Sequence, residues 1–242
     1  MVHIGIIPDG NRRWFKKNNF DYKNINQILK VWFNKFLKLL NSISILKNND
    51  ELFKIKSLTF YVCSIDNMYR EDATKEHILA FLDLLLNFYK NYEEIINNYP
   101  DLELENKKLL LKYLNDLLKN LNICIVGDID ILPDKLKCHF KEFNSKYDKS
   151  KPYNLYLGIA YDFKKDLLNF GLQNNENYIR EQSNLDIILR TGGEFRVSGF
   201  FPCHNNYAEI FILDKYWPEI EIANINSVIY DFLFKRNRRF GK

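Results

Sequence analysis

The sequence is poor in the features that mark secreted, zinc-binding and membrane-spanning proteins. Only four of its 242 residues are cysteines, and none forms a Cys-x-x-Cys pair, so neither a disulfide framework nor a zinc site is indicated. No apolar run reaches the length of a membrane span. Met1-Val2-His3 leads directly into an apolar run, which leaves no room for a signal peptide. We therefore expect a cytoplasmic protein.

Strong charge and internal repetition are also missing. The net charge is only +4 at pH 7, and no basic stripe alternates with aromatic residues. This balance suits a phosphorylated substrate or an anionic membrane surface, and it argues against a nucleic-acid partner. No repeat or low-complexity linker divides the chain, and 46% of its residues are hydrophobic, enough for a sizeable core. We expect a single domain over residues 1–242.

Short apolar runs alternate along the chain with amphipathic helical patterns. Periodicity predicts strands at 3–8, 56–62, 122–126, 153–160, 187–189 and 210–213, and helices at 24–43, 71–98, 102–121 and 221–234. This alternation is typical of an α/β fold, with a central, mostly parallel β-sheet covered by helices on both faces. Such sheets bind their ligands at the carboxyl ends of the strands.

One of these carboxyl ends carries a set of anion-binding residues. The run 187–189 delivers Arg190 directly before a pair of glycines at 192–193, and Arg196 and Ser198 follow closely. Two glycines leave backbone N–H groups bare, while the guanidinium and hydroxyl groups add further donors. A phosphate or diphosphate is the expected ligand. The alternative is that the glycines only form a turn and the arginines line a solvated rim.

The first predicted strand, 3–8, ends in a second candidate anion site. Arg12 and Arg13 can neutralise a diphosphate that Asp9 would otherwise repel. A carboxylate facing a diphosphate makes sense if Mg²⁺ bridges the two. Glu209, a lone carboxylate at a strand entrance among apolar neighbours, is a candidate for the second metal ligand. A β-turn followed by an exposed basic helix start is the alternative for this segment.

Several motifs together resemble one enzyme family. They are D-G-N-x-R-W at 9–14, R-T-G-G-E-x-R-x-S-x-F at 190–200, Y-A-E at 207–209, W-P at 217–218 and R-x-R-R-F-G at 236–241. In this order they resemble the cis-prenyltransferases, the undecaprenyl diphosphate synthase family. The chain has no D-D-x-x-D cluster, so it does not resemble the trans-prenyl synthases.

The resemblance implies a Mg²⁺-dependent condensation of isopentenyl diphosphate onto an allylic diphosphate, farnesyl or geranyl, that gives a Z-polyprenyl diphosphate. It implies that Asp9 and Asn67 are catalytic, and that Asp9 and Glu209 hold the metal, in one chain or across a homodimer interface as in the family. The positions that match substrate-binding residues are Gly10, Asn11, Arg12, Arg13, Trp14, Ser64, Arg70, Arg190, Arg196 and Ser198.

The chain also departs from the family pattern. The histidine that the family has between the first loop and the first helix has no clear counterpart in the segment 22–26. Cys63 and Met68 replace aromatic residues of the allylic pocket, Phe195 stands where histidine is frequent, and the glycine pair after Tyr161 is lost. A non-catalytic partner subunit of a heteromeric enzyme is therefore the alternative function.

The helix at 71–98 has an unusually apolar face. The residues alone favour simple packing on the sheet. The resemblance instead implies that this long helix walls a hydrophobic tunnel for the growing chain, and that the product brings the protein into peripheral contact with a membrane. The interval before residue 127 is longer than is usual in the family, which places a helical insertion at about 98–121.

Overall fold

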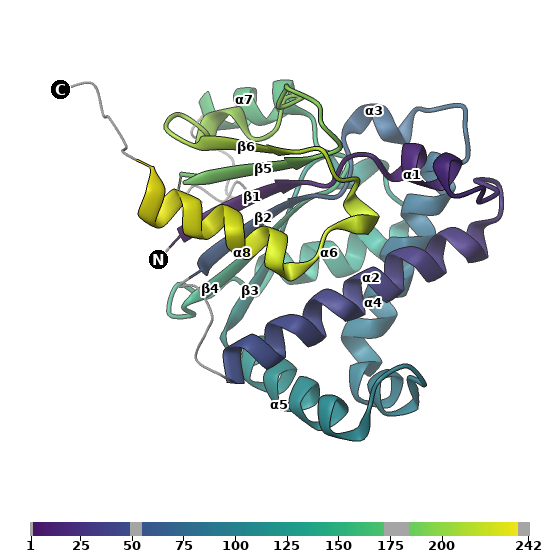
Figure 1. Ribbon diagram of the computed structural model, residues 1–242. Coiled ribbons are helices and arrows are strands. Elements are labelled where there is room, and N and C mark those ends of the chain that lie inside the picture. The colour runs from purple at the N-terminus through teal and green to yellow at the C-terminus, as the bar shows by residue number, and fades with distance from the viewer. Residues whose placement is uncertain (1, 49–54, 172–183, 237–242) are drawn as a thin grey trace.

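A computed structural model describes residues 2–48, 55–171 and 184–236 (Figure 1). In this part of the chain a sheet of parallel strands has the order β3-β4-β2-β1-β5-β6. The strands are β1 (Val2–Ile7), β2 (Ile55–Tyr61), β3 (Leu121–Val126), β4 (Tyr153–Gly158), β5 (Ile187–Thr191) and β6 (Glu209–Leu213). The α/β fold with a central parallel sheet is thus confirmed.

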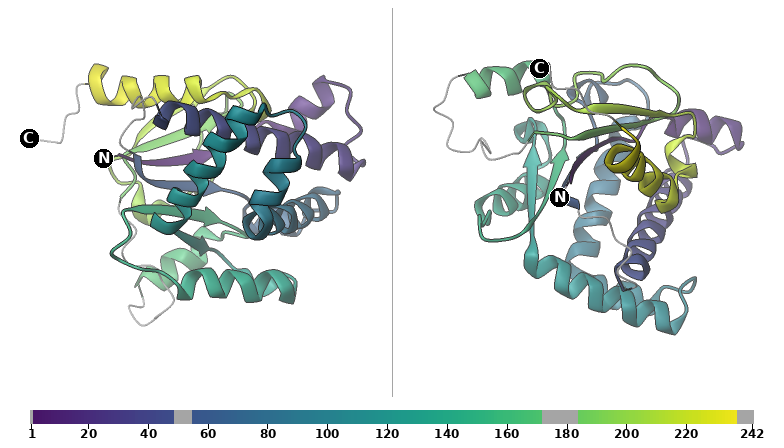
Figure 2. Two further views of the ribbon diagram at one scale, coloured as in Figure 1. Left: turned by 90° about the horizontal axis from the view of Figure 1, so that it is seen from below. Right: turned by 60° about the vertical axis from the view of Figure 1, so that its left-hand side comes forward.

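The helices lie on both sides of this sheet. Figures 1 and 2 show α2, α4 and α5 grouped on one side, with α7 on the other. The helices are α1 (Asn11–Lys17), α2 (Ile25–Asn48), α3 (Ile65–Met68), α4 (Thr74–Asn98), α5 (Leu104–Asn120), α6 (Asp134–Ser145), α7 (Phe163–Gly171) and α8 (Ile222–Tyr230). Helix α5 occupies most of the predicted insertion at about 98–121, and its status as an insertion stays a prediction.

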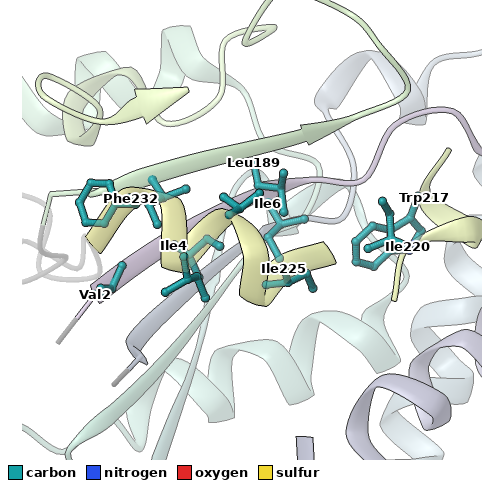
Figure 3. Close-up of a cluster of buried hydrophobic side chains, with 11 residues drawn as sticks. Val2, Ile4, Ile6, Leu189, Trp217, Ile220, Ile225 and Phe232 are labelled. Atoms are coloured by element: carbon teal, nitrogen blue, oxygen red, sulfur yellow. The ribbon is translucent and has the colours of Figure 1, made fainter. Parts of the chain in front are cut away.

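Strands β1 and β5 form the fully buried centre of the fold. Every residue of both strands is buried, as expected for central parallel strands covered on both faces. Their side chains on one face pack against α8, and Figure 3 shows Ile4, Ile6 and Leu189 beneath this helix. Trp217 and Ile220 belong to the same cluster. We call this cluster the α8 core.

A second apolar cluster joins α4 and α6 to β3. Its buried members include Leu82 on α4 and Leu136 on α6. Leu58 and Phe60 on β2 pack against the α8 core and are only half-buried, although β2 is a central strand. Side chains at the centre of a parallel sheet are normally covered completely. Leu58 and Phe60 therefore keep some exposed apolar surface where the α8 core meets Leu39 of α2.

Candidate active site

Three of the predicted site segments converge at the carboxyl edge of the sheet. Strands β2, β1 and β5 are neighbours, and Ile7 at the end of β1 pairs with Arg190 on β5. Asp9 follows β1, and Ser64 follows β2. Because parallel strands end at one edge, these three loops face a common space, where α/β sheets bind their ligands.

An ion pair with a buried guanidinium group joins the first loop to the last. Arg190 is only 3% exposed, and its NH2 group donates to Oδ2 of Asp9 at 2.7 Å. Its NH1 group donates to Oγ of Ser198 at 2.9 Å and to the carbonyl of Arg196. Most donors of Arg190 are therefore engaged by the protein. Its role as a direct diphosphate ligand stays a prediction, while its role in holding the two loops together follows from these contacts.

Asp9 is held in its ionised form. Burial by itself raises the pKa of this carboxyl group, but the hydrogen bond from Arg190, that from the N–H of Gly10 and the charges of Arg190 and Arg13 outweigh it. The net effect lowers the pKa below its ordinary value. The Gly10 N–H lies 2.5 Å from Oδ1, and the Asp9 side chain is still 32% exposed. A charged carboxylate oxygen therefore faces the site.

Glu194 bridges two arginines from different loops. One carboxylate oxygen lies 2.9 Å from NH1 of Arg13, and the other pairs with Arg196. Arg13 also lies 3.5 Å from Asp9. With Arg190, three guanidinium groups face two carboxylates in this cluster. Sequence reasoning missed this role of Glu194, although the residue stands inside the R-T-G-G-E motif.

The glycines allow close packing, but they do not expose the predicted anion-binding N–H groups. Gly192 has a positive φ of 84°, and a Cβ there would lie 2.7 Å from NH2 of Arg13. Its N–H donates to the carbonyl of Lys215, and that of Gly193 donates to the carbonyl of Leu213. The expectation of bare N–H groups is therefore wrong, because the end of β6 and the segment after it run beside this loop and accept both hydrogen bonds.

Other residues of the first loop hold the loop in place. The Asn11 side chain donates to the carbonyl of Pro8 at 2.8 Å and accepts from Nε1 of Trp32 at 3.2 Å. The carbonyl of Asp9 accepts hydrogen bonds from the Thr191 hydroxyl and the Trp217 N–H. Neither Thr191 nor Trp217 was predicted for the site, although both stand in family motifs. Substrate binding by Asn11 stays a prediction.

The aromatic and glycine residues of this loop pack tightly. Trp14 is half-buried, and its ring lies 5.3 Å from that of Phe20. Gly10 has a φ of 95°, and a Cβ there would lie 2.4 Å from the ring of Tyr216. The guanidinium group of Arg13 lies 5.4 Å from the centroid of the same ring. Tyr216 therefore shapes the first loop, a role that the sequence did not reveal.

The loop after β2 is ordered by its own hydrogen bonds. Oδ1 of Asn67 accepts from the backbone N–H and the hydroxyl of Ser64, at 2.9 and 3.0 Å, which caps α3. The amide nitrogen of Asn67 thereby faces away from Ser64. Arg70 is exposed. Arg12 pairs with Asp72 at 2.5 Å, which ties this loop to the first one.

Glu209 lies at the opposite edge of the sheet. It is the first residue of β6 and pairs with Ile187, the first residue of β5. Its carboxylate lies 3.5 Å from Nε of Arg236. One chain therefore does not bring Asp9 and Glu209 together, and the predicted metal pair requires a second chain. Among the described residues, no group of three or more metal-ligating side chains occurs.

The site lies within a chain that matches one family along nearly its whole length. A family model described as "Putative undecaprenyl diphosphate synthase" matches residues 7–241. The chain belongs to this family. The family resemblance of the sequence motifs is therefore confirmed, and the protein is a prenyltransferase of the cis-prenyl diphosphate synthase type. Residues 237–241 of the carboxyl-terminal motif lie outside the described residues.

Individual relatives agree with this assignment. The chain is 24% identical to a tritrans,polycis-undecaprenyl-diphosphate synthase (geranylgeranyl-diphosphate specific) of Pyrobaculum aerophilum, covering 100% of this chain and 96% of the relative. It is 29% identical to an isoprenyl transferase of Rickettsia bellii, with 100% and 98% covered. The fold is similar to that of lavandulyl diphosphate synthase from Lavandula x intermedia in complex with dimethylallyl diphosphate, with a TM-score of 0.65, 18% identity and 99% and 98% covered.

The described helices also bear on membrane topology. None of the helices within residues 2–48, 55–171 and 184–236 of this prenyltransferase is both long and apolar enough to cross a membrane.

Proposed function

We propose that this protein condenses isopentenyl diphosphate onto an allylic diphosphate, in a Mg²⁺-dependent reaction that forms a Z-polyprenyl diphosphate and releases pyrophosphate. The observation that carries this proposal is the ion pair of Asp9 and Arg190, at the junction of two loops that each present exposed arginines. Family membership supports the same reaction class.

The exposed arginines lie on two loops, and each loop would bind one of the two diphosphates. Arg12 and Arg13 follow Asp9 and would hold the allylic diphosphate, whose charge increases as the carbon–oxygen bond breaks. Positive groups fixed in place stabilise that leaving group. Arg196 and the exposed hydroxyl of Ser198 lie on the other loop and would hold isopentenyl diphosphate. Arg190, buried beneath both loops, would keep the two substrates in a fixed position relative to each other.

Asp9 has the properties of a magnesium ligand. It is ionised, partly exposed and flanked by groups that bind diphosphate. Each carboxylate oxygen has more than one acceptor site, so its present hydrogen bonds leave room for a cation. Mg²⁺ typically takes one or two carboxylates together with phosphate oxygens and water. When bound there, Mg²⁺ would neutralise charge on the departing diphosphate.

The hydrocarbon part of the allylic substrate has an apolar region available to it. Phe60 and Leu58 are half-buried at the centre of the sheet, and many inward residues of α2 are also half-buried. An apolar chain placed over them would remove this remaining surface from water, which is favourable. We therefore propose that α4 walls a tunnel for the growing chain, and that a product extending from it brings the enzyme into peripheral contact with a membrane.

A homodimer would complete the metal site, and we propose this assembly. Glu209 lies on the edge strand β6, where Ile210 is 51% exposed. Leu233 and Phe234, just after α8, are also exposed, and Arg236 lies over the ring of Phe211, so these groups share one region. An apolar edge strand invites pairing with another chain. Light scattering during gel filtration would show a dimer mass.

The direct test is product formation by the purified chain. Labelled isopentenyl diphosphate and Mg²⁺ would be supplied with dimethylallyl, geranyl, farnesyl or geranylgeranyl diphosphate in separate reactions. The first expectation from the sequence, farnesyl or geranyl, is thereby compared with the geranylgeranyl diphosphate of the Pyrobaculum aerophilum relative and the dimethylallyl diphosphate of the lavandulyl diphosphate synthase complex. We expect extractable prenyl products that EDTA abolishes. Inactivity with every primer, reversed by a second related subunit, would instead support the partner-subunit function.

A further inference from the structure

Helix α2 presents two stripes to the interior of the protein. One stripe, which includes Phe33, Phe36, Leu37 and Leu40, packs against α4 and α5. The other stripe follows the spacing of residues 28, 32, 35 and 39, which places these residues on one side of a helix. Ile28 is completely buried, and Leu39 packs against the α8 core. Lys35 is the one charged residue of this second stripe.

The Lys35 side chain lies against an aromatic wall. Its Nζ is 5.9 Å from the centroid of the Trp217 ring, and that ring contacts Phe60 edge-on at 5.2 Å. Lys35 is half-buried, and no carboxylate in the described part of the chain lies within ion-pair distance of it. Burial lowers the pKa of this ammonium group to about 8, although the charge of Glu221 opposes the shift. A half-buried, unpaired cation is costly and points to a functional role.

The position of Trp217 relates Lys35 to the active site. The backbone N–H of Trp217 donates to the carbonyl of Asp9 at 3.0 Å, so the tryptophan lies directly behind the loop that binds the allylic diphosphate. Its ring then extends to Phe60, in the half-buried apolar region of β2. A prenyl tail directed from the first loop along this wall would meet the Lys35 ammonium group.

We propose that Lys35 is a specificity-determining residue that limits how far a prenyl chain can extend along the wall formed by Trp217 and Phe60. This inference rests on the proposed function and adds a residue that selects the length of primer and product. A hydrocarbon tail that covers Lys35 removes the remaining water from an ammonium group that has no carboxylate partner. The desolvation of such a charge is unfavourable. Chains that stop short of Lys35 avoid this cost.

The test compares product length in matched lysine variants. Lys35→Met removes the charge and retains a long apolar side chain, whereas Lys35→Arg retains the charge. Lys38→Met changes an exposed lysine on the same helix and serves as control. We expect Lys35→Met to shift the product distribution by at least one isoprene unit towards longer chains. Lys35→Arg and Lys38→Met should give the wild-type distribution.

Several outcomes would overturn the inference. Wild-type product lengths from a folded, active Lys35→Met protein would do so, as would equal lengthening by Lys35→Arg, since bulk and not charge would then be responsible. If Lys35→Met fails to fold, Lys35→Gln provides the same comparison with a polar side chain. Failure of the proposed function is distinguishable, because the wild-type protein would then form no product with any primer.

Discussion

The charged edge of the sheet and the half-buried apolar residues of β2 beside α2 are built in opposite ways. At the edge, Asp9, Arg13, Arg190 and Glu194 already contact one another in the absence of substrate. Beside α2, Phe60 and its neighbours retain exposed apolar surface. The proposed function therefore places a ligand group of fixed size and charge at the preorganised edge, and chains of variable length on the apolar residues. Catalysis and product length should respond to different substitutions.

The largest effect should come from Asp9, which pairs with Arg190 and is the proposed metal ligand. Asp9→Asn retains the shape of the side chain but removes its charge, so we expect a loss of turnover of at least 100-fold, on the order of that for other electrostatic catalytic groups. Product length, where residual product is measurable, should not change. Initial rates with labelled isopentenyl diphosphate and chain-length analysis by thin-layer chromatography would check both expectations.

Asp9→Ala provides a stability comparison for the same position. It leaves the buried guanidinium of Arg190 without its carboxylate, and removing one partner of a buried pair typically costs about 3–5 kcal/mol. Urea unfolding should therefore show lower stability for Asp9→Ala than for Asn, which can still accept from Arg190. Equal activity in Asp9→Asn and wild type would exclude the metal and leaving-group roles of Asp9.

Substitutions of Arg190 and Arg196 should have different kinetic effects, because Arg190 holds the two loops together and Arg196 is proposed to bind one substrate. Arg190 holds both loops, so Arg190→Lys should lower kcat/KM for both substrates, by on the order of 100-fold. A lysine cannot reproduce the forked contacts to Asp9 and Ser198.

Arg196→Ala removes an exposed cation and should chiefly raise the KM for isopentenyl diphosphate. Steady-state kinetics with each substrate varied in turn would measure this difference, and an effect of Arg196→Ala confined to the allylic substrate would reverse the assignment of the loops.

The sequence predicted the edge well because its motifs stand directly after strands. Asp9, Ser64 and Arg190 each follow an apolar run, and parallel strands bring such positions together without further information. Glu209 could have been placed from the same rule. It stands at the entrance of a strand, so in a parallel sheet it belongs to the opposite edge. Its isolation among apolar neighbours suggested a metal role, and the family resemblance then connected it with Asp9.

Other features depend on contacts that no local pattern specifies. The glycine N–H groups at 192 and 193 donate to carbonyls at the end of β6 and in the segment after it, and this pairing depends on the sheet order. The bridge from Glu194 to Arg13 likewise joins residues far apart in sequence. The sequence indicated an apolar helix over 71–98, but the region that it faces depends on how α2, α4 and α6 pack, which periodicity alone does not determine.

Substitutions on α4 test the proposed tunnel, and they should change the reaction rate less than substitutions of Asp9 or Arg190. Phe81 contacts Trp32 on α2, and Leu82 packs with α6. Leu85 is half-buried. Helical geometry places its side chain between those of Phe81 and Leu82 around the helix axis, on the side towards the sheet. Leu85→Trp should therefore shorten the products, because added bulk reduces the space for the chain. Ala80 lies on the other side of the helix, so Ala80→Trp is the matched control. Identical product distributions from the two variants would contradict a tunnel wall at α4.

The smallest expected effect is a pH dependence of product length. The folded pKa of Lys35 is lowered to about 8 from the ordinary 10.5, because burial outweighs the attraction of Glu221, and Lys38 and Lys215 lower it further. The folded protein therefore loses this charge as pH rises through about 8. Between about pH 8 and pH 10.5 the folded protein is stabilised relative to the unfolded chain, because the buried charge is no longer present. Covering a neutral amine costs less than covering an ammonium group. Wild-type products should thus lengthen slightly between pH 7 and pH 9, measured as a distribution and independently of rate, whereas Lys35→Met should show the same distribution at both pH values. A pH-dependent shift of equal size in Lys35→Met would assign the effect to another group.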